Sequence, residues 1–126
     1  MMKQLLLVDD DAFLRDMYAL KFTESGYQVQ NAPTGHQALK LIAQSPQLDV
    51  ILLDMVMPGL SGVELIEQIK ELFPDLSAAC VVLSNQGDES DIAAATQAGA
   101  AGYIIKAEAI PSDVVKQVTK IIGNTT

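Results

Sequence analysis

Five short apolar runs, each followed by a segment with helical periodicity, constrain the fold of this chain more than any other feature of its sequence. The runs cover residues 4–9, 27–31, 50–54, 79–84 and 102–105. After the first run, Phe13, Met17 and Leu20 recur at helical spacing, together with Ala12 and Ala19. Alternating strands and helices predict an α/β protein in which a parallel sheet is covered by helices on both faces.

The boundaries of the predicted helices carry matching signals. These are Gly26 and Gly99 after helices, capping boxes of Thr34 with Gln37 and of Ser61 with Glu64, and Pro111 in a first turn. We see no internal repeat and no linker long enough to separate domains. With 126 residues the chain has the length of one domain, and we expect residues 1–126 to form a single one.

The composition excludes several classes of protein. Sixteen acidic residues against eight basic ones give a net charge of −8, which disfavours direct binding to nucleic acid and favours cationic partners or ions. No apolar run approaches the ~20 residues of a membrane span, and the N-terminus lacks a signal peptide. The single cysteine, Cys80, lies in an apolar run and is predicted to be a buried thiol, which suits the reducing cytoplasm.

Polar and charged side chains stand where the predicted strands end. These are Asp9 and Asp10 at the end of the first, Asn31 at the end of the second, Asp54 at the end of the third, Ser84 at the end of the fourth and Lys106 directly after the fifth. The carboxyl ends of parallel strands share one edge of the sheet, where ligands bind. One lysine cannot balance three carboxylates, so the group predicts a Mg²⁺ site. An aspartate beside such an ion can accept a phosphoryl group, whose charge the metal and the lysine would neutralise while the serine donates a hydrogen bond.

The motifs at those strand ends resemble the response-regulator receiver domains of two-component signalling, including the chemotaxis regulators. The matching segments are Leu-Val-Asp9-Asp10, Asp54-Met-Val-Met57-Pro58 with Gly62 beyond, Val-Leu-Ser84, and Gly102-Tyr103-Ile-Ile-Lys106. They follow the order and spacing of the family and span essentially the whole chain. The resemblance implies a single receiver domain over residues 1–126, with a flavodoxin-like (βα)5 doubly wound sheet of strand order 2-1-3-4-5.

The resemblance also implies a phosphoacceptor and a metal site. Asp54 would receive a phosphoryl group from a histidine of a sensor kinase or phosphotransfer protein. Asp10 would bind Mg²⁺ directly and Asp9 largely through water, with Asp54 and the backbone carbonyl of Val56 completing the protein ligands. Such a domain is a signalling module rather than an enzyme, because it catalyses only its own phosphorylation and dephosphorylation.

By the same resemblance, Ser84, Lys106 and Tyr103 transmit the signal. Ser84 would turn toward the phosphoryl group, Lys106 would pair with it, and burial of Tyr103 would follow. The surface of the fourth helix, fifth strand and fifth helix would then change, and it would control a downstream protein or form a self-dimer. We expect no output domain in this chain unless it is part of a longer regulator.

The sequence departs from the family pattern beside these residues. Ala107 follows Lys106 where family members carry a proline with a cis bond, and a trans bond is expected here because a cis non-proline bond costs about 3–4 kcal/mol. Asn85 replaces a small residue and narrows access to the site. Val56 and Gln86 occupy positions that tune dephosphorylation in the family.

Three other functions can be compared with the sequence, which disfavours the first two. A phosphatase with an aspartyl-phosphate intermediate needs a second acid two positions after the nucleophile, where this chain has Val56. A flavin- or nucleotide-binding module needs a phosphate-binding loop after the first strand, where three aspartates would repel a phosphate. A receiver-like docking module that works without phosphorylation is the third, and the altered loop at Ala107 leaves it open.

Overall fold

The computed structural model describes residues 2–123 and shows five strands that alternate with five α-helices along the chain. The strands are β1 (Gln4–Val8), β2 (Gln28–Ala32), β3 (Val50–Leu53), β4 (Ala79–Ser84) and β5 (Gly102–Ile105). The helices are α1 (Ala12–Glu24), α2 (Gly35–Ala43), α3 (Gly62–Leu72), α4 (Glu89–Ala98) and α5 (Pro111–Gly123), and a 3-10 turn, η1, covers Lys106–Glu108. The predicted alternation is confirmed.

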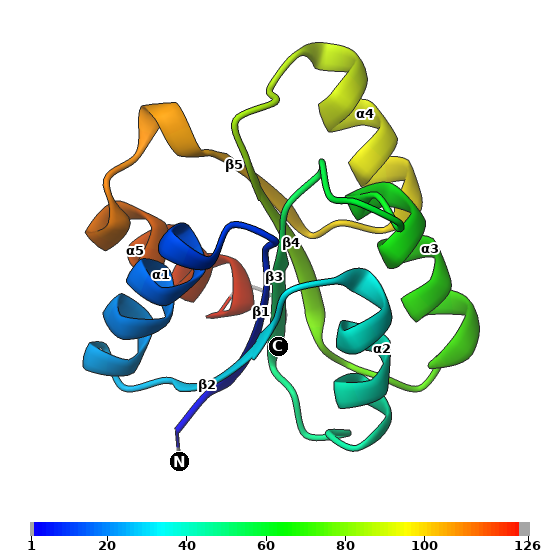
Figure 1. Cartoon of the computed structure of the whole chain (residues 1–126), viewed down its shortest axis with the longest axis horizontal. Helices are drawn as coiled ribbons and strands as arrows, with labels where there is room; N and C mark the ends of the chain where they lie inside the picture. Colours follow the sequence, from blue (N-terminus) through cyan, green and yellow to red (C-terminus); the bar gives the residue numbers. More distant parts are fainter. Residues whose placement is uncertain (1, 124–126) are drawn as a thin grey trace.

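All strand pairs of the sheet are parallel, and the order is β2-β1-β3-β4-β5. Helices α1 and α5 cover one face of the sheet, and α2, α3 and α4 cover the other (Figure 1). The predicted doubly wound α/β fold and strand order are therefore correct. Every residue of β3 and β4 is buried, as expected of strands with helices on both sides.

Alternate residues of each central strand enter two separate cores. The core beneath α1 and α5 contains Leu5, Leu7, Leu52, Val81, Ile104, Phe22, Val114 and Val118. The core beneath α2, α3 and α4 contains Leu6, Val8, Ile51, Leu53, Cys80, Val82, Ile42, Leu65, Ile66 and Ile69. Burial of each such aliphatic side chain contributes about 1.5–3 kcal/mol, so both helix layers are held firmly on the sheet. Cys80 is fully buried, as predicted, and burial raises the pKa of its thiol.

The helix α1 forms as predicted, and of the apolar residues named from the sequence Met17 and Ala19 pack against the core, whereas Phe13 and Leu20 do not. Phe13 is 77% exposed and Leu20 is 62% exposed, whereas Tyr18 and Phe22 are buried. The helix carries two apolar stripes, and the edge-to-face packing of Phe22 on Tyr27, with ring centroids 5.1 Å apart, belongs to the inner one. Helical periodicity shows that a stripe exists, but it does not decide which of two stripes meets the sheet.

The predicted helix boundaries agree with the structure. Both hydrogen bonds of the capping box between Ser61 and Glu64 are present. Of the box predicted for Thr34 and Gln37, the bond from the N–H of Gln37 to the Thr34 hydroxyl is formed and the reciprocal one is not. Gly99 ends α4 with a φ of 117°, and α5 begins at Pro111. Within residues 2–123, none of the helices combines the length and the apolar character needed to cross a bilayer.

Candidate phosphoryl-acceptor site

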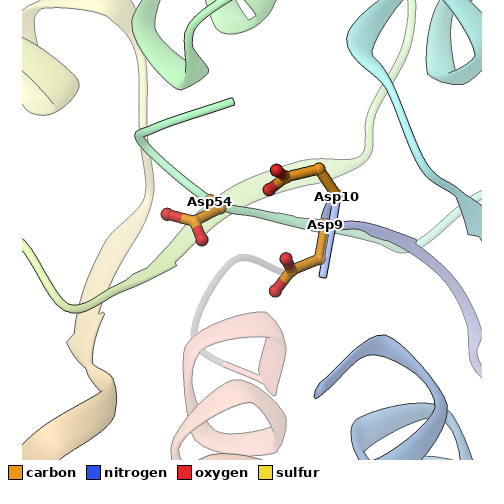
Figure 2. A group of neighbouring side chains, drawn as sticks. All are labelled: Asp9, Asp10 and Asp54. Atoms are coloured by element: carbon orange, nitrogen blue, oxygen red, sulfur yellow. The ribbon is translucent and has the colours of Figure 1, made fainter. Parts of the chain in front are cut away.

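Three aspartates meet where β1 and β3 end. These strands are neighbours, and the pairing of Val8 with Leu53 brings the following residues, Asp9 and Asp54, out side by side. Asp10 comes next on the same loop, and one carboxylate oxygen from each of the three lies within 4.8 Å of the others. Figure 2 shows Asp9 and Asp10 leaving the chain on different sides, next to Asp54.

Lys106, the first residue after β5, reaches into this cluster. Its Nζ lies 2.9 Å from Oδ2 of Asp54 and 3.1 Å from Oδ2 of Asp9, and only 7% of its side chain is exposed. Burial lowers the pKa of the Lys106 ammonium, but the hydrogen bonds and charges of Asp54 and Asp9 together outweigh burial, so the pKa is raised. The lysine therefore stays charged between the two carboxylates.

Asp9 and Asp10 differ in how firmly they are held. Asp9 is 2% exposed; its Oδ1 accepts from the backbone N–H of Asp11 at 2.9 Å, and its Oδ2 faces Lys106. The backbone carbonyl of Asp9 accepts from Nη1 of Arg15 at 2.8 Å. Asp10 is exposed. One acid is thus locked into the site and the other faces solvent.

The loop after β3 sets the position of Asp54. Oδ1 of Asp54 accepts from the backbone N–H of Val56 at 3.2 Å, and the side chain of Val56 is 62% exposed. The N–H of Gly62 donates to the carbonyl of Met55 at 2.9 Å. A Cβ on Gly62 would lie 2.7 Å from Cα of Met55 and would press on the carbonyl oxygen of Asp54. The start of α3 therefore packs directly against the backbone that carries Asp54.

Ser84 and Tyr103 meet at a single residue of the loop between β4 and α4. The hydroxyl of Ser84, which is 1% exposed, accepts from the N–H of Gln86 at 3.1 Å. The hydroxyl of Tyr103 donates to the carbonyl of the same Gln86. Burial is the main reason that the pKa of Tyr103 is raised, followed by the negative charge of Asp91.

The structure also tests the predicted place of Asn31 and the predicted trans bond after Lys106. Asn31, predicted as the last residue of the second strand, is the last but one and is exposed, because β2 runs one residue further than predicted, to Ala32. Every peptide bond among residues 2–123 is trans, including the one between Lys106 and Ala107. The trans bond agrees with the expectation for a lysine that no proline follows.

Sequence reasoning did not single out Arg15 or the backbone of Gln86. Arg15 lies on α1 among polar and apolar residues, and no motif indicates that it reaches the carbonyl of Asp9. A signal was available in composition alone, because Arg15 is the one arginine of the chain. The hydrogen bonds of Gln86 to Ser84 and Tyr103 are made by its backbone, so the residue type at this position does not predict them.

The family model of the response regulator receiver domain matches residues 5–119. The chain belongs to this family. It is 33% identical over 120 residues to the chemotaxis protein CheY of Thermotoga maritima, a match that covers 94% of this chain and 97% of CheY.

Receiver domains of transcriptional regulators match as well. Identity is 31% to the phosphate regulon regulator PhoB of Pseudomonas aeruginosa, with 98% of this chain and 53% of PhoB covered. It is 35% to KdpE of Mycobacterium tuberculosis, with 83% and 45% covered. This receiver chain thus spans about half the length of those regulators.

Solved structures show the same fold. The chemotaxis protein CheY4 of Vibrio cholerae superposes with a TM-score of 0.88 at 24% identity, over 96% of this chain and 99% of that one. The signal receiver domain of the regulator NarL from Mycobacterium tuberculosis does so with a TM-score of 0.85 at 26% identity, over 97% of each chain. The receiver fold is therefore shared well beyond the residues that form the site.

The acidic cluster of this receiver domain suits a hard divalent cation. Three carboxylates against one ammonium leave negative charge uncompensated, and Mg²⁺ binds to one or two carboxylates together with water and phosphate oxygens. The exposed Asp10 has its carboxylate available for such an ion, whereas both oxygens of Asp9 already accept hydrogen bonds. The donor set fits Mg²⁺ as a partly hydrated ion rather than one enclosed by protein.

Proposed function

We propose that this receiver domain accepts a phosphoryl group on Asp54 from a phosphohistidine of a sensor kinase or phosphotransfer protein. A carboxylate oxygen of Asp54 would attack phosphorus, an O–P bond would form, and the P–N bond would break with its electron pair returning to the imidazole. The observation that carries the proposal is the meeting of Asp54 with Lys106, Asp9 and Asp10 at one edge of the sheet. We further propose that residues 1–126 make up one such domain.

Each charged group of the cluster has a role in this reaction. Asp9, Asp10 and Asp54, with the carbonyl of Val56, would hold Mg²⁺, which supplies positive charge for the phosphoryl oxygens. Lys106 already lies 2.9 Å from Asp54 and would stay beside the new phosphoryl group. Since the ammonium is buried and its pKa is raised, it supplies this charge without first being desolvated.

The proposed output runs through Gln86. Ser84 would turn to donate to a phosphoryl oxygen and would thereby release the N–H of Gln86. The carbonyl of Gln86 holds the hydroxyl of Tyr103, so the two proposed switch residues are joined through one residue. The surface of α4, β5 and α5 would change in response and would bind a downstream protein or a second copy of the chain.

The surroundings of the site also fit a protein as phosphoryl donor. Phe13, 77% exposed, lies two residues beyond the helix cap Asp11, and Ile110, 63% exposed, follows the turn that begins at Lys106. Leu20 continues the stripe along α1. Exposed apolar side chains at this spacing suit packing against a helix of another protein.

Labelling with a small phosphodonor tests the proposal. With Mg²⁺ and acetyl phosphate, intact-protein mass spectrometry should show one added phosphate on the wild-type chain and none on Asp54→Ala. Asp75→Ala, which removes an exposed carboxylate far from the cluster, is the matched control and should be labelled normally. Full labelling of Asp54→Ala would refute Asp54 as the acceptor.

A docking module that works without phosphorylation is the second candidate. The observation in its favour is the hydrogen bond of Tyr103 to Gln86, which is already formed while Ser84 still accepts from the same residue. If this candidate is right, a partner captured through α4, β5 and α5 binds Asp54→Ala and the phosphorylated wild type with equal affinity. A difference in affinity would favour the phosphorylation switch.

A further inference from the structure

Arg15 is the one arginine of this chain, and it contacts the loop that carries two of the acids. It lies in the first turns of α1, is half-buried, and donates from Nη1 to the backbone carbonyl of Asp9 at 2.8 Å. Among residues 2–123, the ion pairs are those of Lys106, so no carboxylate holds the guanidinium of Arg15. Its contact with the acidic cluster is therefore through the backbone.

The carbonyl that Arg15 contacts belongs to the peptide that joins Asp9 to Asp10. Because a peptide unit is planar, fixing its oxygen also fixes its N–H and the direction in which the chain enters Asp10. The side chain of Asp9 does not need this support, since Asp11 and Lys106 already hold its carboxylate.

Asp10 is in the opposite position. Its side chain is exposed, and within residues 2–123 its carboxylate makes no hydrogen bond or ion pair. The place of that carboxylate near Asp9 and Asp54 is therefore set by the backbone that leads into it. Two side chains hold this backbone: the carboxylate of Asp9 accepts from the N–H of Asp11 after Asp10, and Arg15 holds the carbonyl of the peptide before it.

We infer that Arg15 is a positioning residue for the metal site, which holds the peptide between Asp9 and Asp10 so that the Asp10 carboxylate faces the ion shared with Asp54. The inference rests on the proposed function, because it requires that the cluster bind Mg²⁺. A hydrogen bond from a guanidinium is stronger than a neutral one, and loss of an outer partner of a metal ligand typically weakens metal binding by about 10–100-fold.

The direction in which Mg²⁺ affinity changes distinguishes a positioning role of Arg15 from a purely electrostatic one. Removing a positive charge near an acidic site makes the site more negative and should tighten Mg²⁺ binding. Removing a group that aligns a ligand should weaken it. Arg15→Met deletes both the charge and the donor while keeping an apolar stem of similar length. Lys21→Met, on the same helix, deletes one charge that does not contact the loop.

Calorimetric titration of the full chain with MgCl₂ tests the inference, and urea unfolding without metal shows that each variant is folded. We expect the Kd of Arg15→Met to rise about tenfold or more and that of Lys21→Met to stay level or fall slightly. Arg15→Lys keeps the charge but loses the planar fork, and its Kd should rise by a smaller factor.

An Arg15→Met Kd at or below the wild-type value overturns the inference. If Arg15→Met does not fold, Arg15→Lys takes its place, and wild-type affinity in that variant overturns the inference instead. Absence of Mg²⁺ binding in the wild-type chain would overturn the proposed function itself, and with it the role of Arg15.

Discussion

At the scale of single residues, the position of Asp54 depends on a residue without a side chain. Gly62 begins α3, donates to the carbonyl of Met55, and lies against the backbone of Asp54. The backbone of both partners forms the contact, so neither can move aside as a flexible side chain could. In the sequence, Gly62 belongs to the motif that follows Asp54, but the sequence does not show that its backbone packs against that of Asp54.

Gly62→Ala should therefore destabilise the domain and displace Asp54. We expect a loss of about 1–3 kcal/mol in the free energy of unfolding, because a methyl group is forced into a packed contact. Urea unfolding measures the loss, and labelling by acetyl phosphate should slow in the same variant. Gly123→Ala, where a Cβ meets no atom within 4 Å, is the matched control. Equal stability of the two variants would contradict this account.

At the scale of elements, α1 has apolar residues on two sides, one packed on the sheet and one exposed. Its inner stripe, with Tyr18 and Phe22, packs on the sheet, and its outer stripe, with Phe13 and Leu20, is exposed. The helix also contacts the loop after β1: Asp11 caps its first turn, and Arg15 donates to the carbonyl of Asp9. The helix α1 would thus contact both the proposed metal ligands and a docked phosphoryl donor.

Phe13→Ala and Leu20→Ala should each slow phosphoryl transfer from a protein donor and leave labelling by acetyl phosphate unchanged. Exposed positions change stability by about 0.5 kcal/mol or less, whereas an apolar anchor of an interface contributes about 1–2 kcal/mol, or roughly tenfold in affinity. Transfer kinetics from a phosphorylated histidine protein measure the effect. Leu72→Ala, 56% exposed on α3, is the control and should transfer normally. Equal slowing in all three variants would argue against a donor surface on α1.

At the scale of the whole molecule, negative charge gathers at the edge of the sheet where the proposed cation would bind. The chain carries a net charge of −8, and three of its carboxylates lie together, of which two pair with Lys106. An ion that binds the folded state alone stabilises it by mass action, by about 1.4 kcal/mol at ten times its Kd. If the cluster binds Mg²⁺ as proposed, metal binding should therefore raise the free energy of unfolding of this domain.

Addition of MgCl₂ should raise the urea midpoint of the wild-type chain, and EDTA should return it to the metal-free value. Asp10→Ala should lose most of this gain, because the exposed carboxylate is the one free to bind the ion. Asp75→Ala, an acid outside the cluster, should keep the full gain. An equal gain in Asp10→Ala and the wild type would place the ion elsewhere.

The alternation of apolar runs was sufficient to predict the sheet, its two helix layers and the edge at which Asp9, Asp54 and Lys106 lie. Parallel strands bury both faces and bring their carboxyl ends together, so the pattern in the chain translates directly into a place in space. The exact ends of strands followed less directly: β2 ends at Ala32 rather than at Asn31, because strand pairing with β1 continues for one more residue.

By itself, then, the sequence determined which residues lie at the carboxyl ends of the strands, because local periodicity and strand parallelism decide that. Tertiary structure alone decided which stripe of α1 packs inward, that Arg15 holds the carbonyl of Asp9, and that Lys106 pairs with an acid 97 residues away. The reason is physical. Periodicity along a helix sets the angles between side chains, whereas the distances between distant groups depend on how whole elements pack against one another.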